Sequence, residues 1–478
     1  MDSGIGNSPL KRRKIDGSNN SSDGIAHHDH VVDTCTKNVV VGTPSTLDEY
    51  NSMLMRNQSW EYSANVEPFS HWIAQGITED EAAYRLKTSK WLKETAITMR
   101  RGEFPDKDNE VEDWIKWAGI SLVQKYDNFA EYSNDEILPH WEEFIAALKQ
   151  FNPAVVSNSL SEEHTTYFAF GNFRLSQDIM ALIKEALSGK SYSLLHFEHN
   201  EEVEYEYGGL NVDAILDLAE SNVHLQELEI HCNRMQFSNM RRINNVVRNH
   251  PSLVGLDLWR CFRRPGMGNR MLEILLHNDL ELETLAMGCN GITTDGIIEL
   301  ARFLGSNPSL IELDLEDNQL GEYSEAVLIS NALEKNTTLK RLLLKDNNCD
   351  SLSIECLRHA LYDDRSLNAM SDSNHYCDFP ELDDFITCLN DYEDVKANRG
   401  RKIYAVLSHR NHDEDKSNLQ DFIDIDTKML PKVLEVVQHY DTEYPDVDEA
   451  ECVLPRVGSL SIVYEIMRKW DKVFNDVY

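Results

Sequence analysis

Apolar residues recur in one phrase, at an almost constant period, between Leu225 and Asn347. The phrase reads LQELEIHCN, LVGLDLWRC, LETLAMGCN, LIELDLEDN and LKRLLLKDN, which is the pattern L-x-x-L-x-L-x-x-(N/C). Its closing positions lie 28 or 29 residues apart, at Asn233, Cys261, Asn290, Asn318 and Asn347. Apolar residues two apart, such as Leu313 and Leu315, share one side of an extended chain. Each phrase therefore predicts a short strand with one buried and one solvated face.

The segments between the phrases have a helical period. In TTDGIIELARFLGSNPS, the residues Ile297, Leu300, Ala301 and Leu304 follow the i, i+3, i+4, i+7 spacing, and Gly305 is a stop signal. SEAVLISNALEKN and SLSIECLRHALYD repeat this arrangement. The chain therefore alternates one strand with one helix.

A strand–helix unit of this length resembles the leucine-rich repeat, in its long ribonuclease-inhibitor-like form. The resemblance implies an α/β fold: a right-handed leucine-rich-repeat solenoid, a horseshoe arc of repeats with helical caps at both ends. It also implies that each closing Asn or Cys satisfies backbone groups of neighbouring turns. Such solenoids present a concave surface to partners, so binding is the expected activity.

The array extends beyond the five clear phrases. Upstream, a repeat is indicated by Tyr192, Leu195, Phe197 and Asn200, and a weaker one by Tyr167, Ala169 and Asn172. Downstream, LNAMSDSNH keeps the spacing through Leu367 and Met370, but Asp372 takes an inward position, as suits a last repeat. About eight units are therefore predicted across residues 153–378.

Three regions lie outside the array. Residues 1–45 are polar and predict a disordered tail. Residues 46–152 hold six of the eight tryptophans and the amphipathic segments EDEAAYRLKTSKWLKETAITMRR and PHWEEFIAALKQF, which predict a Trp-rich helical cap. An aromatic ligand cage is the alternative use of these tryptophans. Residues 379–478 predict a helical C-terminal cap.

The C-terminal region carries a further resemblance. Its predicted helices are NRGRKIYAVLSHRN, LPKVLEVVQHY and LSIVYEIMRKW. This succession is similar to the tail of the expanded leucine-rich-repeat families of microalgae. The resemblance covers roughly residues 190–478 and implies a fold and a capping region, but no biochemical activity.

The net charge of −36 disfavours general binding to nucleic acids or anionic membranes, because phosphates would be repelled. A basic protein partner is the natural counterpart, and solubility alone is the alternative explanation. Nine cysteines without framework spacing disfavour a disulfide scaffold. With no apolar run of transmembrane length and no N-terminal h-region, the sequence predicts an intracellular, nuclear or cytoplasmic protein.

The N-terminal tail contains two small motifs. Lys11, Arg12, Arg13 and Lys14 form a compact cationic run, which is either a nuclear localisation signal or a solvated basic patch. His27, His28, Asp29 and His30 could hold a metal only weakly, because the tail is unanchored. No metal or cofactor is expected anywhere in the chain.

The repeat register predicts which strand side chains face a partner. They include His196, Glu198, Glu227, Glu229, His231, Asp257, Trp259, Thr284, Ala286, Glu312, Asp314, Glu316, Arg341, Leu343 and Lys345. Trp259 is the notable member, because the pattern demands no apolar residue there. It is either a binding hot spot or a residue packed across the strands.

Charge reverses locally around Trp259. Eight arginines and one acid, Asp257, lie between Arg234 and Arg270. Arg260, Arg263 and Arg264 are predicted to crowd the loop that leaves the Trp259 strand, where their guanidinium groups suit carboxylate or phosphate. Partner contact and internal pairing with the acidic loop EHNEEVEYEYGG are the two alternatives.

No catalytic constellation is present in the sequence. G-x-x-x-x-G-K, H-E-x-x-H, G-x-S-x-G and paired C-x-x-C motifs are all missing, and His196 and His231 are expected to lie two repeats apart. The sequence therefore predicts a non-enzymatic protein-interaction scaffold. The alternatives are a Ran-type GTPase activator, which this chain resembles in repeat class and charge, and an acidic inhibitor of a basic enzyme.

Overall fold

The computed structural model describes residues 46–442, except 58–59, 109–116, 124–131, 133, 158–164, 174–175, 199–211, 263, 278–279, 381, 383–385, 387–388, 391–394 and 413–427. All of these residues belong to one compact unit, Gly42–Tyr478. The predictions for the tail of residues 1–45, for the acidic loop after Glu198 and for a helix at residues 460–470 lie outside the described residues.

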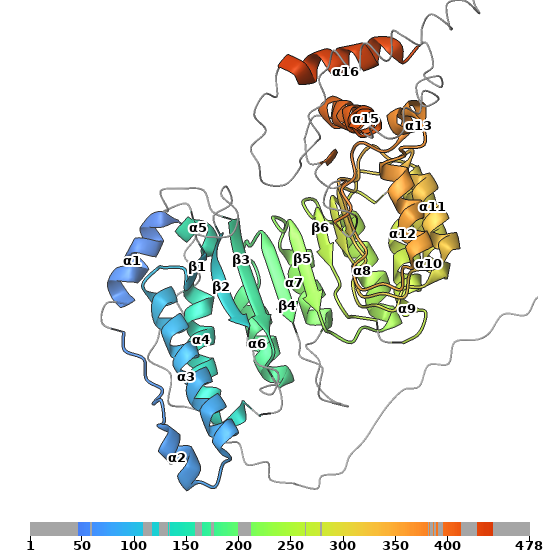
Figure 1. The fold of residues 1–478 in the computed structure, drawn as a ribbon. Coiled ribbons are helices and arrows are strands. Elements are labelled where there is room, and N and C mark those ends of the chain that lie inside the picture. Colours follow the sequence, from blue (N-terminus) through green and yellow to red (C-terminus); the bar gives the residue numbers. More distant parts are fainter. Residues whose placement is uncertain are drawn as a thin grey trace, which may run out of the picture. The chain divides into compact units, whose positions relative to one another are not determined.

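Within the described residues, nine strands form one sheet in which sequence neighbours are also spatial neighbours (Figure 1). They are β1 (Asp106–Asp108), β2 (Trp117–Val123), β3 (Thr165–Gly171), β4 (Leu194–Glu198), β5 (Glu227–His231), β6 (Gly255–Asp257), β7 (Thr284–Ala286), β8 (Glu312–Asp314) and β9 (Arg341–Leu343). The first pair is antiparallel and every later pair is parallel. This order confirms the α/β leucine-rich-repeat solenoid.

A helix follows each strand from β3 onward. Within the array these are α6 (Gln177–Leu187), α7 (Val212–Ser221), α8 (Phe237–Asn249), α9 (Met267–Leu276), α10 (Thr294–Gly305), α11 (Tyr323–Leu333) and α12 (Ser351–Leu361). Leu256, Leu285 and Leu313 are register partners on neighbouring strands and are almost fully buried. The helices bury the opposite wall of the same core, as Ile297 and Leu304 do from α10. The leucines thus serve packing, which leaves the alternate strand positions free to vary.

The chain turns sharply where it leaves each strand. The residue before the closing Asn or Cys has a left-handed backbone, with φ of 52–56° at Cys232, Arg260, Cys289, Asp317 and Asp346. The closing residue then bonds to adjacent turns. Asn290 Nδ2 donates to the carbonyls of Leu258 (2.8 Å) and Gly288 (3.0 Å), and its Oδ1 accepts from the amides of Cys261 (2.8 Å) and Phe262 (2.9 Å). The predicted backbone role of the closing position is therefore confirmed.

The weak upstream repeat was predicted one residue out of register. In β3 the register partners of Leu195 and Phe197 are Phe168 and Phe170, both fully buried, rather than Tyr167 and Ala169. The Thr-Thr-Tyr-Phe-Ala-Phe run offers apolar residues on both faces of the strand, and burial selects the larger pair.

The downstream phrase is also corrected. Leu367 and Met370 belong to helix α13 (Leu367–Asp372), so Asp372 holds no inward strand position. The sheet ends instead in a single bridge between Arg341 and Asp378, beside the buried Phe379. The apolar spacing of LNAM satisfies a short helix as well as it satisfies a strand.

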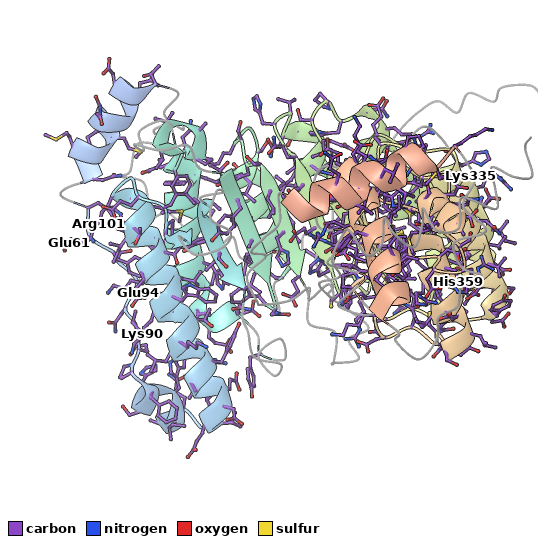
Figure 2. All side chains as sticks on the ribbon, turned by 45° about the horizontal axis from the view of Figure 1, so that its top comes forward. Glu61, Lys90, Glu94, Arg101, Lys335 and His359 are labelled. Atoms are coloured by element: carbon purple, nitrogen blue, oxygen red, sulfur yellow. The ribbon has the colours of Figure 1, made fainter. Side chains whose placement is uncertain are left out.

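The N-terminal region is helical in large part, as predicted, but it also contributes strands β1 and β2 to the sheet. Its helices are α1 (Leu47–Asn57), α2 (Phe69–Ala74), α3 (Glu79–Arg100), η2 (Asp135–Ile137), α4 (Leu138–Gln150) and α5 (Pro153–Ser157). In α3 the side chain of Leu92 is buried, whereas Lys90 and Glu94 are exposed on its outer side (Figure 2). The prediction of a helical region for residues 46–152 thus missed strands β1 and β2.

Two of the predicted tryptophans lie in the core of this region. Trp141 is fully buried against Phe144, Phe170 and Phe173, and its Nε1 donates to Asn134 Oδ1 at 3.1 Å. Trp72 is 6% exposed and lies under the guanidinium of Arg85. Packing, rather than a ligand cage, therefore accounts for these two side chains.

The described part of the C-terminal region contains α15 (Val395–His412) and α16 (Leu430–Thr442), which pack against each other. Lys402 of α15 is fully buried, and its Nζ donates to the carbonyls of Leu361 (2.5 Å) and Asn374 (2.6 Å). The lysine thereby joins α15 to the last repeat, where Leu361 ends α12.

Candidate protein-interaction face

The strand side chains that point away from the helices form a continuous surface, which we call the open face. Its members in β4–β9 are His196, Glu198, Glu227, Glu229, His231, Asp257, Thr284, Ala286, Glu312, Asp314, Arg341 and Leu343. The alternating burial along β4 and β5 shows this separation of faces directly. The predicted partner-facing positions in these strands therefore lie on one surface.

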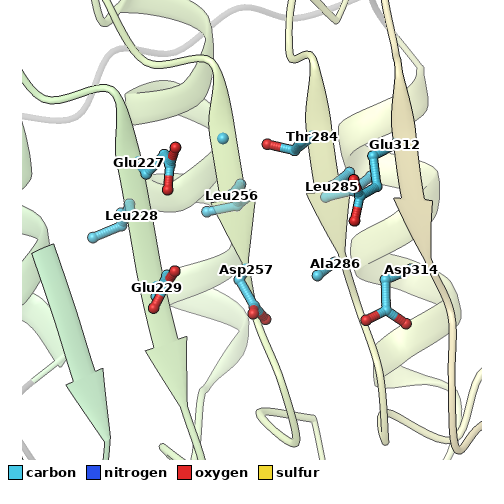
Figure 3. Close-up of a pocket in the computed structure, with 11 residues that line it drawn as sticks. Glu227, Leu228, Glu229, Leu256, Asp257, Thr284, Leu285, Ala286, Glu312 and Asp314 are labelled. Atoms are coloured by element: carbon cyan, nitrogen blue, oxygen red, sulfur yellow. The ribbon is translucent and has the colours of Figure 1, made fainter. Parts of the chain in front are cut away.

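An acidic hollow of about 220 Å³ lies on the open face across β5–β8 (Figure 3). Glu227, Glu229 and Asp257 stand on one side of it, and Glu312 and Asp314 stand on the other. Small residues occupy the strands between these acids.

Small size is what opens the hollow. A Cβ atom at Gly255 would approach Thr284 Oγ1 to 2.8 Å and Glu227 Cγ to 2.9 Å. Ala286 is the register partner of both Asp257 and Asp314, so it separates these two carboxylates with a single methyl group. The sequence predicted Asp257, Thr284, Ala286 and Asp314 as partner-facing, but it did not include Gly255 and did not single out the small residues.

The acids of the hollow are only partly compensated. Burial, together with the charges of Glu316, Asp257 and Glu312, raises the pKa of Asp314 to about 6. Burial and the charge of Glu229 also raise the pKa of Glu227. Glu312 differs, because Arg341 Nη1 lies 2.9 Å from its Oε2. An added positive charge would therefore be stabilised in the hollow.

Two histidines border the hollow on the side of β4 and β5. His196 and His231 lie on adjacent strands with ring centroids 4.7 Å apart, so the expectation that they are two repeats apart is wrong. His196 Nδ1 lies 2.6 Å from Glu229 Oε2, and His231 Nε2 lies 2.8 Å from Asp257 Oδ2. Burial alone would lower the pKa of His196, but its bonds to Glu198 and Glu229 outweigh burial and raise the pKa to about 9. This part of the face thus also favours positive charge.

Trp259 lies immediately beyond β6 and packs across to the next repeat. A Cβ atom at Gly288 would meet Trp259 Cζ3 at 2.0 Å, so the indole covers this glycine. The Trp259 amide donates to Asp257 Oδ1 at 2.9 Å. The structure therefore gives the indole a packing role while leaving it half-buried, and its part in partner binding stays a prediction.

The predicted arginine rim divides into paired and unpaired side chains. Arg260 and Arg264 are exposed, and neither makes an ion pair within the part of the chain that the structure describes, whereas Arg263 lies outside that part. On α8, Arg242 binds Asp217 and also lies 3.0 Å from Glu220. Internal pairing with α7 thus explains Arg242, and the acidic loop lies outside the described residues.

The predicted site residues fall into two neighbouring groups. The structure brings together Glu229, His231, Asp257, Glu312 and Asp314 around the hollow. Trp259, Arg260, Arg264 and Glu316 follow the ends of their strands. The sequence did not reveal the contact between His196 and Glu229, because these register partners on adjacent strands lie far apart along the chain.

No family model matches the chain. A segment of 181 residues is 28% identical to NACHT, LRR and PYD domains-containing protein 3 of Macaca mulatta, and covers 38% of this chain and 17% of that protein. The human protein of the same name is 29% identical over 192 residues, which are 38% of this chain and 18% of the relative. Human NACHT, LRR and PYD domains-containing protein 14 is 31% identical over 183 residues, which are 37% and 17% of the two chains.

The matches therefore span less than a fifth of the length of these relatives. They support a leucine-rich-repeat assignment, while the finer resemblances to ribonuclease-inhibitor repeats and to microalgal families stay predictions. Among the described residues, no helix has the length and apolarity needed to cross a membrane.

Proposed function

We propose that the chain is a non-enzymatic interaction scaffold that binds a basic segment of a partner protein on its open face. The observation that carries this proposal is the acidic hollow, in which small residues leave room between two groups of carboxylates. A lysine or arginine side chain has the charge and the length to enter it. The leucine-rich-repeat relatives support an interaction module in general terms.

Electrostatics favours a cationic partner over a neutral one. Burial, together with the charges of neighbouring carboxylates, raises the pKa values of Asp314 and Glu227. A partner ammonium or guanidinium would relieve this repulsion, and the net charge of −36 would speed its approach. An inhibitor of a basic enzyme is one form that such a scaffold could take.

The test compares two sets of variants by affinity purification and quantitative mass spectrometry. Asp257→Asn, Glu312→Gln and Asp314→Asn are combined to remove three charges from the hollow. Glu273→Gln, Glu299→Gln and Glu355→Gln remove the same charge from α9, α10 and α12 as the matched control. We expect partners with basic segments to be lost, by at least about tenfold, only with the first set.

A second arm examines the rim. Arg260→Glu with Arg264→Glu is matched by Arg241→Glu with Arg248→Glu, which are exposed on α8. If the rim contributes, the first pair lowers partner recovery without lowering the melting temperature. Equal recovery from the hollow variants and their control would refute the proposal; a joint loss of fold and binding at the rim would assign those arginines a structural role.

A second candidate function is activation of a Ran-type GTPase. It is favoured by Arg260 and Arg264, which are exposed and make no ion pair with any residue that the structure describes. Such activation would require contacts at the rim rather than in the hollow. The two arms therefore separate the candidates, because a GTPase partner would be lost with the rim pair alone. Nuclear localisation through Lys11–Lys14 is a further proposal that the sequence supports.

A further inference from the structure

Three side chains from two adjacent strands converge beside the acidic hollow. One ligand atom each from His196, Glu229 and His231 lies within 4.8 Å of the other two. His196 and Glu229 are register partners on β4 and β5, and His231 follows Glu229 by two residues on the same face. The convergence therefore results from hydrogen-bonded strands rather than from mobile loops.

We propose that His196, Glu229 and His231 form a binding site for a divalent transition-metal ion of the zinc class. Two imidazole nitrogens and one carboxylate oxygen are a donor set that zinc accepts. Zinc–ligand bonds of about 2.0–2.2 Å fit within the present spread of donor atoms, provided that small rotations open the His196–Glu229 contact. The proposed site shares Glu229 with the hollow, but metal binding there does not require a partner protein.

Asp257 offers a fourth donor beside these three side chains. Its Oδ2 lies 2.8 Å from the buried His231 Nε2. A metal ion that took the nitrogen lone pair would replace this contact and bring Asp257 within reach as an additional oxygen ligand.

The surroundings suit a bound cation. The Nδ1 atom of His196 is directed at Glu229, and its Nε2 atom lies 3.8 Å from Glu198 Oε2. Each ring nitrogen therefore has a carboxylate nearby. Carboxylates in this position orient metal-binding imidazoles and increase their basicity. Without a metal, the same carboxylates hold protonated histidine; binding would release the imidazole proton to solvent and replace it with the ion.

The full chain, stripped of metal with a chelator, would be titrated with Zn²⁺ by calorimetry and with Co²⁺ by visible absorption. His196→Ala and His231→Ala should each remove one equivalent of binding and the cobalt spectrum of a low-coordinate site. Glu229→Gln keeps the side-chain shape and should weaken Zn²⁺ binding by about 10-fold or more. His277→Ala, an exposed histidine that ends α9, is the matched control and should bind normally.

The tail histidines require their own control. His27→Ala, His28→Ala and His30→Ala are combined, and the one equivalent assigned to the open face should survive in that variant. Circular dichroism and melting temperature identify any variant that fails to fold, in which case Glu229→Gln decides. The proposal is overturned if no equivalent remains in the tail variant, or if His196→Ala and His231→Ala proteins bind as the unaltered chain does.

Discussion

Asn290→Ala should destabilise the solenoid severely, although it removes only a few atoms. The side chain is 1% exposed and makes four hydrogen bonds, two as donor to Leu258 and Gly288 and two as acceptor from Cys261 and Phe262. At about 1 kcal/mol for each bond, with stranded buried groups adding to the cost, we expect a loss of roughly 3–5 kcal/mol in the free energy of unfolding.

A cysteine at the closing position should have an effect intermediate between those of asparagine and alanine, and the chain contains a natural example. Cys261 occupies the equivalent position one repeat earlier, where its Sγ lies 2.8 Å from the Ile230 carbonyl and 3.5 Å from that of Trp259. A thiol has a single proton, so it can donate to only one of two carbonyls at a time, and it accepts poorly from the two amides. Asn290→Cys should cost about half as much as Asn290→Ala, roughly 2 kcal/mol.

Urea unfolding followed by circular dichroism and tryptophan fluorescence measures both losses, provided that the two transitions coincide. Hydrogen exchange should also increase at the Cys261 and Phe262 amides. Asn249→Ala is the control, because that exposed amide makes one bond within its own helix and should cost less than about 0.5 kcal/mol. A loss below about 1 kcal/mol for Asn290→Ala, with both amides still protected, would refute this reasoning.

Two further predictions concern titration. The folded pKa of Asp314 is raised from 3.8 to about 6, so its ionisation destabilises the fold as pH rises from about 4 to 6. Asp314→Asn should therefore stabilise the protein at pH 7.5 by roughly 1 kcal/mol, after allowance for solvent screening. Thermal melts should show that this gain vanishes near pH 4, whereas the exposed control Glu281→Gln should show no such dependence on pH. Burial lowers the folded pKa of Lys402 from 10.5 to about 7, so the unfolded chain binds the extra proton and stability should rise with pH between about 7 and 10.5. Lys402→Met should abolish this rise and cost about 1–3 kcal/mol by stranding the Leu361 and Asn374 carbonyls, whereas an unchanged pH profile would contradict a buried neutral amine.

The sequence predicted the array best where each phrase carried all of its markers. From β5 to β9, large apolar residues two apart and a closing Asn or Cys determined both the register and the open face. In β3 the markers were ambiguous: Asn172 resembles a closing Asn, but its left-handed backbone (φ 61°) and its register place it one position earlier. Phe173 takes the closing position there and is buried with the other aromatic residues.

The site was less predictable, because it depends on distances between strands. The sequence named Glu229, Asp257 and Asp314 as partner-facing, but the hollow arises from Gly255 and Ala286, which a search for reactive residues passes over. Strand β2 was missed for a related reason. Its inward Ala118, Ile120 and Leu122 alternate correctly, yet no leucine phrase or closing Asn surrounds them.

The inward strand positions and the open-face positions have different physical roles, and this difference constrains which substitutions the protein can accept. Inward leucines and closing residues such as Asn290 bond or pack to neighbouring repeats, so their substitution alters stability first. Open-face residues such as Asp314 and His196 are already held by strands that do not need their side chains, so substitution there alters charge and recognition first. Raised pKa values on the open face are consistent with this separation, because acids selected for folding alone would gain nothing from being crowded. The cationic partner that we propose would offset the unfavourable charge of the hollow.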